Sequence, residues 1–403
     1  PLGGDASPML DGTFAENPAK WTGNGARAPQ PKFDDWYETV KINYGVRPGG
    51  TFDFPRLPAD YASKDWPAHY AFWQGKTVPS SWKKFRDITQ FWLAQGVDGF
   101  RYDMAEMVPV EFWSYLNSQI KHTDPDALLL AEVYNPKLYR DYVHLGKMDY
   151  LYDKVDFYDQ MKRIMQGKSD TTPLVAIQAD YADIEHHLLH FLENHDEQRI
   201  ASPEFAGDAC IGMPAMVVSA TISTAPTLLY FGQEVGEKGE GNPGFGKASR
   251  TTIFDYWGVP AHQRWMNDGA FDGGRSTPDE KQLRAFYSTL MQFTRKAPAL
   301  MGQYRELHTG NLGNPGYDGS VFAFARWSQD QQLLVLSNFS TGNGKSFDFD
   351  VSPMLADWRL PDGASRFRDV LTGNRYTVTF SAGKATVPVR LDPLQSLILE
   401  RLP

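Results

Sequence analysis

Cysteine is almost absent from this chain of 403 residues, which contains only Cys210. A single thiol cannot form an internal disulfide, so the sequence excludes a disulfide-stapled fold and leaves the cellular compartment open. Long apolar runs are missing as well, because none reaches the ~18–20 residues that a helix needs to span a membrane. The sequence therefore predicts a globular protein without a membrane span.

Basic residues are outnumbered, with 40 Lys and Arg against 49 Asp and Glu and a net charge of −9 at pH 7. This balance argues against polyanionic partners such as nucleic acid, and a neutral substrate fits better. A chain of this length is too long for one compact core, and its 41% of hydrophobic residues can bury a core of real size. We therefore expect two or three domains.

The pattern along the chain changes twice. The first 58 residues contain 16 Gly plus Pro and show no sustained helical or strand period, so residues 1–78 are predicted to form an irregular insert. In residues 79–303, short apolar runs alternate with helical patterns at a repeat of roughly 30 residues, which predicts parallel βα units. In residues 304–403 the period becomes two, which predicts an antiparallel β-sandwich.

The apolar runs of the central region give five strand candidates, which are residues 97–102, 127–131, 150–152, 188–192 and 227–231. An open doubly wound sheet could be built from five strands, whereas a (β/α)8 barrel needs eight. Nothing upstream of residue 80 supplies the other three.

Acidic residues stand where three of these strands end. Asp103 closes the first, Glu132 closes the second, and Asp196 follows the fourth. The C-terminal ends of parallel strands line one pocket, so we expect the three carboxylates to converge. Adjacent strand ends can hold two carboxyls roughly 5 Å apart, the separation of a retaining glycosidase.

Such a site needs carboxylates in different protonation states. Arg101 lies two residues before Asp103, on the same strand face, and would keep Asp103 ionised for attack on the anomeric carbon. Glu132 follows an apolar strand, where desolvation would favour the protonated form that donates to the leaving oxygen. Asp196 could bind sugar hydroxyls, with a hydrogen bond from His195 to the same sugar. Any one of these residues alone would more often be a helix cap or a surface ion pair, but the three together favour a site.

These residues resemble the α-amylase superfamily of glycoside hydrolases (family 13). Asp103 would form the covalent glycosyl intermediate, Glu132 would be the general acid/base, and Asp196 would stabilise the transition state. The predicted substrate-binding residues are Arg101, Asn194 and His195, together with Tyr102 and Tyr134, which flank the acids and could stack on sugar rings. The matching segments are Gly99–Asp103, Leu130–Glu132, Phe191–Asp196, Thr227–Glu234 and, in the inserted B domain of the family, Trp36–Asn43.

The chain departs from the family pattern in two places. The early motif on strand three, an Asp followed by Asn-His, is absent, so strands one to three of the barrel are expected outside this sequence, either on a separate chain or on a part that was cut away. A natural truncation that no longer works is the alternative. Many members carry Lys-His three and four residues after the nucleophile, where this chain has Glu106 and Met107. A structural calcium, as the family has, stays possible, although its usual ligands fall at these two departures. No metal site is assigned, and the chemistry needs no cofactor.

The fold that the resemblance implies is a (β/α)8 TIM barrel with part of a B-domain insert and the C-terminal β-sandwich. The implied function is hydrolysis, with retention, of α-1,4 links in starch or malto-oligosaccharides. An α-glucan transglycosylase or isomerase on the same site and a non-catalytic carbohydrate-binding homologue are the alternatives. A secreted, periplasmic or cell-surface location is expected because intact starch does not enter cells, and a cytoplasmic location stays open.

Overall fold

The computed structural model describes residues 32, 42–47, 50–240, 258–358, 363–381 and 383–402. The chain divides into two compact units, Pro1–Leu151 and Tyr152–Pro403. Most of the predicted insert of residues 1–78, including Trp36, lies outside the described residues.

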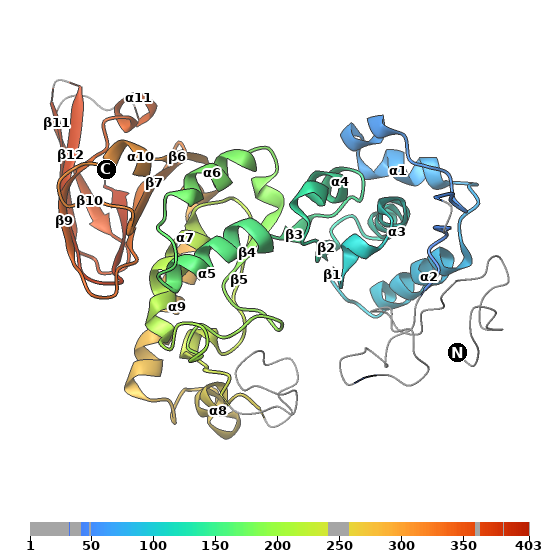
Figure 1. Ribbon diagram of the computed structural model, residues 1–403, viewed down its shortest axis with the longest axis horizontal. Helices are drawn as coiled ribbons and strands as arrows, with labels where there is room; N and C mark the ends of the chain where they lie inside the picture. Colours follow the sequence, from blue (N-terminus) through green and yellow to red (C-terminus); the bar gives the residue numbers. More distant parts are fainter. Residues whose placement is uncertain are drawn as a thin grey trace. The chain divides into compact units, whose positions relative to one another are not determined.

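The first unit holds three parallel strands, β1 (Gly99–Tyr102), β2 (Leu128–Ala131) and the start of β3 (Tyr150–Tyr152). Arg101 is in register with Leu130, and Leu130 in turn with Tyr150. A Cβ on Gly99 would lie 2.1 Å from the carbonyl oxygen of Leu128, so only glycine allows β1 to approach β2 this closely. The helices of the unit (Figure 1) are α1 (Trp66–Trp73), α2 (Ser80–Ala94), α3 (Val110–Thr123) and α4 (Tyr139–His144), with short turns η1 (Ala59–Ser63), η2 (Ala105–Met107) and η3 (Pro136–Leu138).

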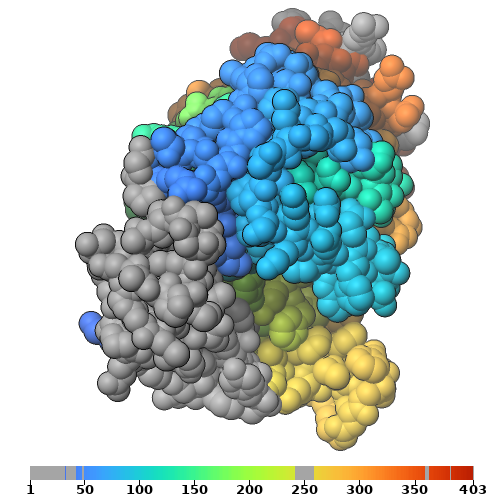
Figure 2. Space-filling view, turned by 90° about the vertical axis from the view of Figure 1, so that its right-hand side faces the viewer, coloured from blue at the N-terminus to red at the C-terminus, as the bar shows by residue number. Residues whose placement is uncertain are grey.

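Helix α3 is the centre of this unit and packs against both α1 and α2. Its buried residues Phe112 and Leu116 recur at helical spacing, and the ring of Phe112 meets that of Trp82 from α2 at 5.6 Å. Helix α2 also carries three large apolar side chains that are exposed, Ile88, Phe91 and Trp92. Figure 2 shows α2, in light blue, at the surface of this unit.

The α/β part of the second unit contains β4 (Leu188–Phe191) and β5 (Thr227–Leu228), which pair in parallel with His190 opposite Thr227. Asp153, the residue after β3, donates its N–H to the carbonyl of Leu189 at 3.0 Å, so the chain leaving β3 runs along β4. The helices here are η4 (Lys154–Tyr158), α5 (Asp159–Met165), α6 (Pro173–Asp180), η5 (Glu185–His187), η6 (Ala209–Ile211), α7 (Gly212–Thr221), η7 (Gln233–Val235), α8 (Pro260–Met266), η8 (Asn267–Gly269), α9 (Pro278–Thr294) and η9 (Pro298–Met301).

The C-terminal region is an antiparallel sheet with the strand order β6-β7-β8-β13-β10-β11-β12-β9. Helix α7 packs on β8 and β13 of this sheet. These two strands and β7 are buried along most of their length, which explains why their sequences are largely apolar. The elements are β6 (Gln303–Glu306), α10 (His308–Asn311), β7 (Val321–Trp327), β8 (Gln332–Asn338), β9 (Lys345–Asp350), α11 (Met354–Trp358), β10 (Gly363–Asp369), β11 (Arg375–Ser381), β12 (Lys384–Leu391) and β13 (Ser396–Arg401).

The two ends of this sheet share one apolar core. Side chains of β7 and β8 at one end and of β9 and β12 at the other belong to the same buried cluster, so the sheet folds over on itself like a sandwich. A buried guanidinium joins the sheet to the α/β part, because Arg326 of β7 donates to the carbonyls of Ile222, after α7, and Leu300, in η9. Burial lowers the pKa of Arg326 to about 10.

The predicted parallel and antiparallel regions are both confirmed. All five strand candidates of the central region contain a parallel strand, although β5 is only Thr227–Leu228. Within the described residues, no helix combines the length and the apolar character that crossing a membrane requires.

Candidate active site

The end of β1 holds an ion pair between two predicted site residues. Arg101 Nη1 lies 2.5 Å from Asp103 Oδ1, as expected of side chains two residues apart on a strand. The Asp103 side chain is 69% exposed and that of Arg101 is 25% exposed. The carboxylate of Asp103 is therefore accessible to a ligand while it stays in contact with the guanidinium.

Glu132 lies beside this pair, directly after β2. Arg101 Nη2 is 3.4 Å from Glu132 Oε2, so one guanidinium contacts both carboxylates. The Glu132 side chain is only 11% exposed, which confirms the predicted burial. The first unit thus brings together an exposed and a buried carboxylate.

Backbone hydrogen bonds connect the two segments that carry these acids. Met104 N donates to Glu132 Oε2 at 2.8 Å, and Ala105 N donates to the Glu132 carbonyl at 2.9 Å. Met104 makes this turn with a left-handed backbone, φ 45°, which costs a non-glycine residue about 1 kcal/mol or more. The position of Glu132 therefore depends on the turn that follows Asp103.

Tyr102 does not belong to the substrate site, and the prediction that it stacks on sugar is wrong. It is buried, its hydroxyl donates to Asn117 Oδ1 at 2.8 Å, and its ring lies 4.5 Å from that of Trp113. Strand alternation explains this outcome, since neighbours of Arg101 and Asp103 on the strand point to the opposite face.

Glu106 is a site-region residue to which the sequence assigned no role. Its Oε2 accepts from Tyr134 N at 2.9 Å and from Asn135 N at 2.8 Å. These amides belong to the second and third residues after Glu132, and Tyr134, a predicted sugar contact, is half-buried. The only sequence signal was the departure from the Lys-His pattern at this position.

The third predicted carboxylate lies in the second unit, in the turn after β4. The side chain of Asp196 is 44% exposed, and its Oδ2 lies 3.1 Å from His195 Nε2. The buried Asn194 accepts from Asp196 N at 2.9 Å and from Glu197 N at 2.8 Å, which fixes the turn. A sugar contact by Asn194 or His195 stays a prediction, as does the convergence of Asp196 with the other two acids.

Charged contacts anchor this turn on both sides. The carboxylate of Glu197 pairs with Lys154 at 3.2 Å and Lys162 at 3.3 Å. Burial alone would raise the pKa of Glu197, but the two ammonium groups and the Tyr158 hydroxyl outweigh it and lower that pKa.

On the other side of the turn, Arg199 donates to Glu193 Oε2 at 2.9 Å and to the Phe231 carbonyl at 2.9 Å. Burial raises the pKa of Glu193 despite this ion pair. The Arg199 contacts tie the segment after β4 to the segment after β5.

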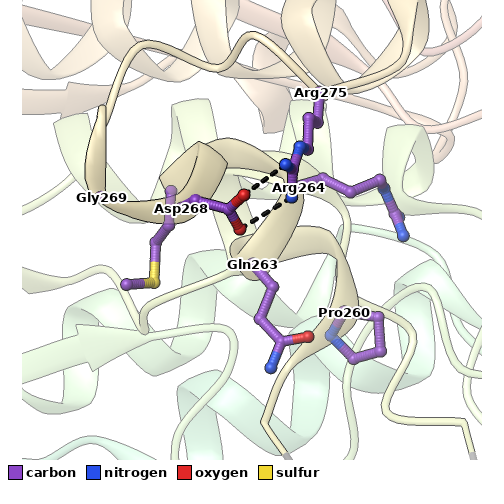
Figure 3. Close-up of a pocket in the computed structure, with 7 residues that line it drawn as sticks. Pro260, Gln263, Arg264, Asp268, Gly269 and Arg275 are labelled. Atoms are coloured by element: carbon purple, nitrogen blue, oxygen red, sulfur yellow. Dashed lines mark hydrogen bonds and ion pairs between the residues drawn. The ribbon is translucent and has the colours of Figure 1, made fainter.

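A hollow of about 590 Å³ lies in the second unit beside α8, and Figure 3 shows its lining. Arg275 Nη1 donates to Asp268 Oδ1 at 2.8 Å across it, and Arg264 of α8 pairs with Glu280 of α9. None of the three predicted carboxylates lines this hollow. Across the described part of the chain, His, Cys, Asp and Glu side chains form no group of three or more that could hold a metal ion.

Both the sequence and the fold of this chain are similar to those of known proteins. Residues 72–255 match the family model for the alpha amylase catalytic domain. The chain is 25% identical over 354 residues to the alpha-1,4-glucan:maltose-1-phosphate maltosyltransferase of Cereibacter sphaeroides, covering 86% of this chain and 46% of that protein. It is 24% identical over 318 residues to neopullulanase 2 of Thermoactinomyces vulgaris, covering 78% and 47%. The chain thus spans about half the length of these curated relatives.

Among solved structures, the fold resembles that of AmyP in complex with maltose. The TM-score is 0.59 at 18% identity, and the match covers 88% of this chain and 71% of that chain. At this identity the likeness concerns the fold alone, and it confirms the predicted class, a (β/α)8 barrel region followed by an antiparallel C-terminal domain.

Proposed function

The chain belongs to the α-amylase superfamily, and on this premise we propose that it is a retaining glycoside hydrolase that cleaves α-1,4-glucosidic bonds in starch or malto-oligosaccharides. The observation that carries the proposal is the single guanidinium of Arg101 between an exposed Asp103 and a buried Glu132. A retaining glycosidase needs one ionised and one protonated carboxyl side by side, and this arrangement supplies different surroundings for the two.

In the first step Glu132 gives its proton to the glycosidic oxygen. Its Oε2 already accepts from Met104 N and faces Arg101, so the transferred proton belongs on Oε1. As the bond from the anomeric carbon to the leaving oxygen breaks, Asp103 forms a bond to that carbon, giving a covalent glycosyl ester.

In the second step Glu132, now ionised, removes a proton from water. The resulting oxygen attacks the anomeric carbon, and Asp103 leaves as a carboxylate. Asp196 and His195 bind hydroxyls of the distorted sugar in both steps. The proposed chemistry runs through the carboxylates alone, so dialysis against a chelator should leave turnover unchanged in protein whose melting temperature is also unchanged. A loss of turnover without a change in melting temperature would contradict this part of the proposal.

Transfer to a sugar acceptor in place of water is the second candidate. A maltosyltransferase among the relatives favours it, because the same two carboxylates serve both outcomes. Products separated by chromatography, with an acceptor sugar present, would distinguish chain shortening from chain extension.

The first unit also offers a surface for further parallel strands. Among the described residues, β1 pairs only with β2, so its other edge has no strand beside it. Helix α2, which precedes β1 in the sequence, exposes Ile88, Phe91 and Trp92. We propose that polypeptide outside this sequence supplies the remaining barrel strands and covers these side chains. We also propose a secreted, periplasmic or cell-surface location, which cell fractionation would test.

The experiment is a reducing-end assay on soluble starch with the protein and any polypeptide that copurifies with it. Asp103→Asn should abolish turnover while sugar binding is kept. Asp268→Asn, which changes an exposed carboxylate beside α8, is the matched control and should retain full activity. Normal turnover by the Asp103→Asn variant would refute the catalytic assignment.

A further inference from the structure

Glu106 connects the segments that follow the two neighbouring strands β1 and β2. It lies in η2, three residues after Asp103, and its Oε2 accepts the N–H groups of Tyr134 and Asn135 at 2.9 and 2.8 Å. Those amides are two and three residues after Glu132. One carboxylate oxygen therefore holds the chain that leaves the buried acid.

The backbone of Glu106 is itself fixed. Its carbonyl accepts from the Tyr142 hydroxyl at 3.1 Å, and the same hydroxyl donates to the Val108 carbonyl at 2.7 Å. Tyr142 comes from α4, which packs against α3 of the same unit. The carboxylate is thus presented from a braced turn and not from a loose loop.

Hydrogen bonds run across both ends of the Glu132 segment. Met104 N and Ala105 N hold the Glu132 side chain and carbonyl, while Glu106 holds the amides beyond it. Removal of the Glu106 carboxylate would break the two bonds to Tyr134 N and Asn135 N and leave the bonds from Met104 N and Ala105 N in place. Bonds to an ionised acceptor are about twice as strong as neutral ones, so this acceptor contributes a large share of the attachment.

We propose that Glu106 is a positioning residue that keeps Glu132 in register with Asp103 and sets the backbone of Tyr134. This inference rests on the proposed function, because it assigns Glu106 a role through the acid/base residue. Misplacing a reacting group by about 1 Å can cost about 100-fold in rate.

The test compares Glu106→Ala with Glu106→Gln in the whole protein. The Gln carbonyl can still accept both amides, so Glu106→Gln should stay within about 3-fold of the parent, whereas Glu106→Ala removes the acceptor and should lower kcat/KM on starch about 10- to 100-fold. Asp126→Ala is the matched control, since Asp126 is exposed before β2, at the opposite end of that strand, and it should leave activity unchanged.

A second substrate separates positioning of the acid from a purely structural role. An aryl malto-oligosaccharide with an acidic phenol as leaving group needs little proton donation, so kcat/KM for its cleavage depends less on Glu132. The Glu106→Ala loss should therefore be much smaller on this substrate than on starch. Equal losses on the two substrates, or no loss on either, would overturn the inference.

The same assays keep the two proposals apart. If the parent protein cleaves neither substrate, the proposed function itself fails. If the parent cleaves both and Glu106→Gln is as impaired as Glu106→Ala, the hydrogen-bonding role assigned to Glu106 is wrong.

Discussion

The buried ion pair between Glu193 and Arg199 allows a sharp test of how the turn carrying Asp196 is held. The two side chains are 3% and 1% exposed, and their charged atoms are 2.9 Å apart. Arg199 also donates to the Phe231 carbonyl, and Glu193 Oε1 accepts from Ile200 N at 2.8 Å. The perturbation is Arg199→Met, which keeps much of the side-chain volume and removes the charge.

The expected cost follows from the charge that remains. Arg199→Met leaves the Glu193 carboxylate buried without its cation, and breaking a buried pair in this way typically costs about 3–5 kcal/mol of unfolding free energy. Adding Glu193→Gln removes the stranded charge while Oε1 still accepts from Ile200 N. The double variant should therefore recover roughly 2 kcal/mol relative to Arg199→Met alone.

The assay is urea unfolding of each variant, with the slope checked for constancy. Arg275→Met is the matched control, because Arg275 and Asp268 form an ion pair with side chains 58% and 73% exposed, which should contribute less than about 1 kcal/mol. Equal losses for Arg199→Met and Arg275→Met would refute the reasoning. So would a double variant no more stable than Arg199→Met.

Three further predictions concern pH, backbone approach and a buried cation. Burial lowers the pKa of His69 from 6.5 to about 4, so the ring stays neutral in the folded state at pH values where the unfolded chain protonates it. The contribution of the neutral ring to the free energy of unfolding is therefore complete above pH 6.5. It should fall by about 2 kcal/mol between pH 7 and pH 5. His69→Gln should remove this part of the pH dependence in thermal melts, and an unchanged profile would contradict it. Gly99→Ala places a Cβ 2.1 Å from the Leu128 carbonyl oxygen, so we expect a loss of about 1–3 kcal/mol and of starch cleavage, measured by melting and reducing-end release. Arg326→Met strands two buried carbonyls and should cost roughly 3 kcal/mol in urea unfolding, whereas a cost below about 1 kcal/mol would show that water replaces the guanidinium.

The parallel strands were predictable because each is a short apolar run between helical patterns. In the C-terminal region the period of two picks out short runs that fall in β7, β8, β11, β12 and β13. It does not mark β6, β9 or β10, whose sequences Gln303–Glu306, Lys345–Asp350 and Gly363–Asp369 are largely polar. Their pairing with neighbouring strands is a tertiary contact that local composition does not encode.

The contact between Arg101 and Asp103 was predictable from strand geometry, since residues two apart share a face. The same rule places Tyr102 on the opposite face of β1, which is why its ring packs inside the unit and not beside the carboxylates. The role of Glu106 was out of reach, because its amide partners lie 28 and 29 residues further on and meet it only through the left-handed turn at Met104. Methionine gives no sequence signal for that conformation.

The turn after Asp103 and the segment after Glu132 form one braced structure inside the first unit, and this has an evolutionary consequence. Asp103 and Glu132, the proposed nucleophile and the proposed acid, are inherited together on a stretch that ends near Asn135 and fixes their mutual placement. The segments after β4 and β5 in the second unit can then diversify without disturbing that pair. Selection can thus change the surroundings of Asp196 while the relative placement of Asp103 and Glu132 is passed on unchanged.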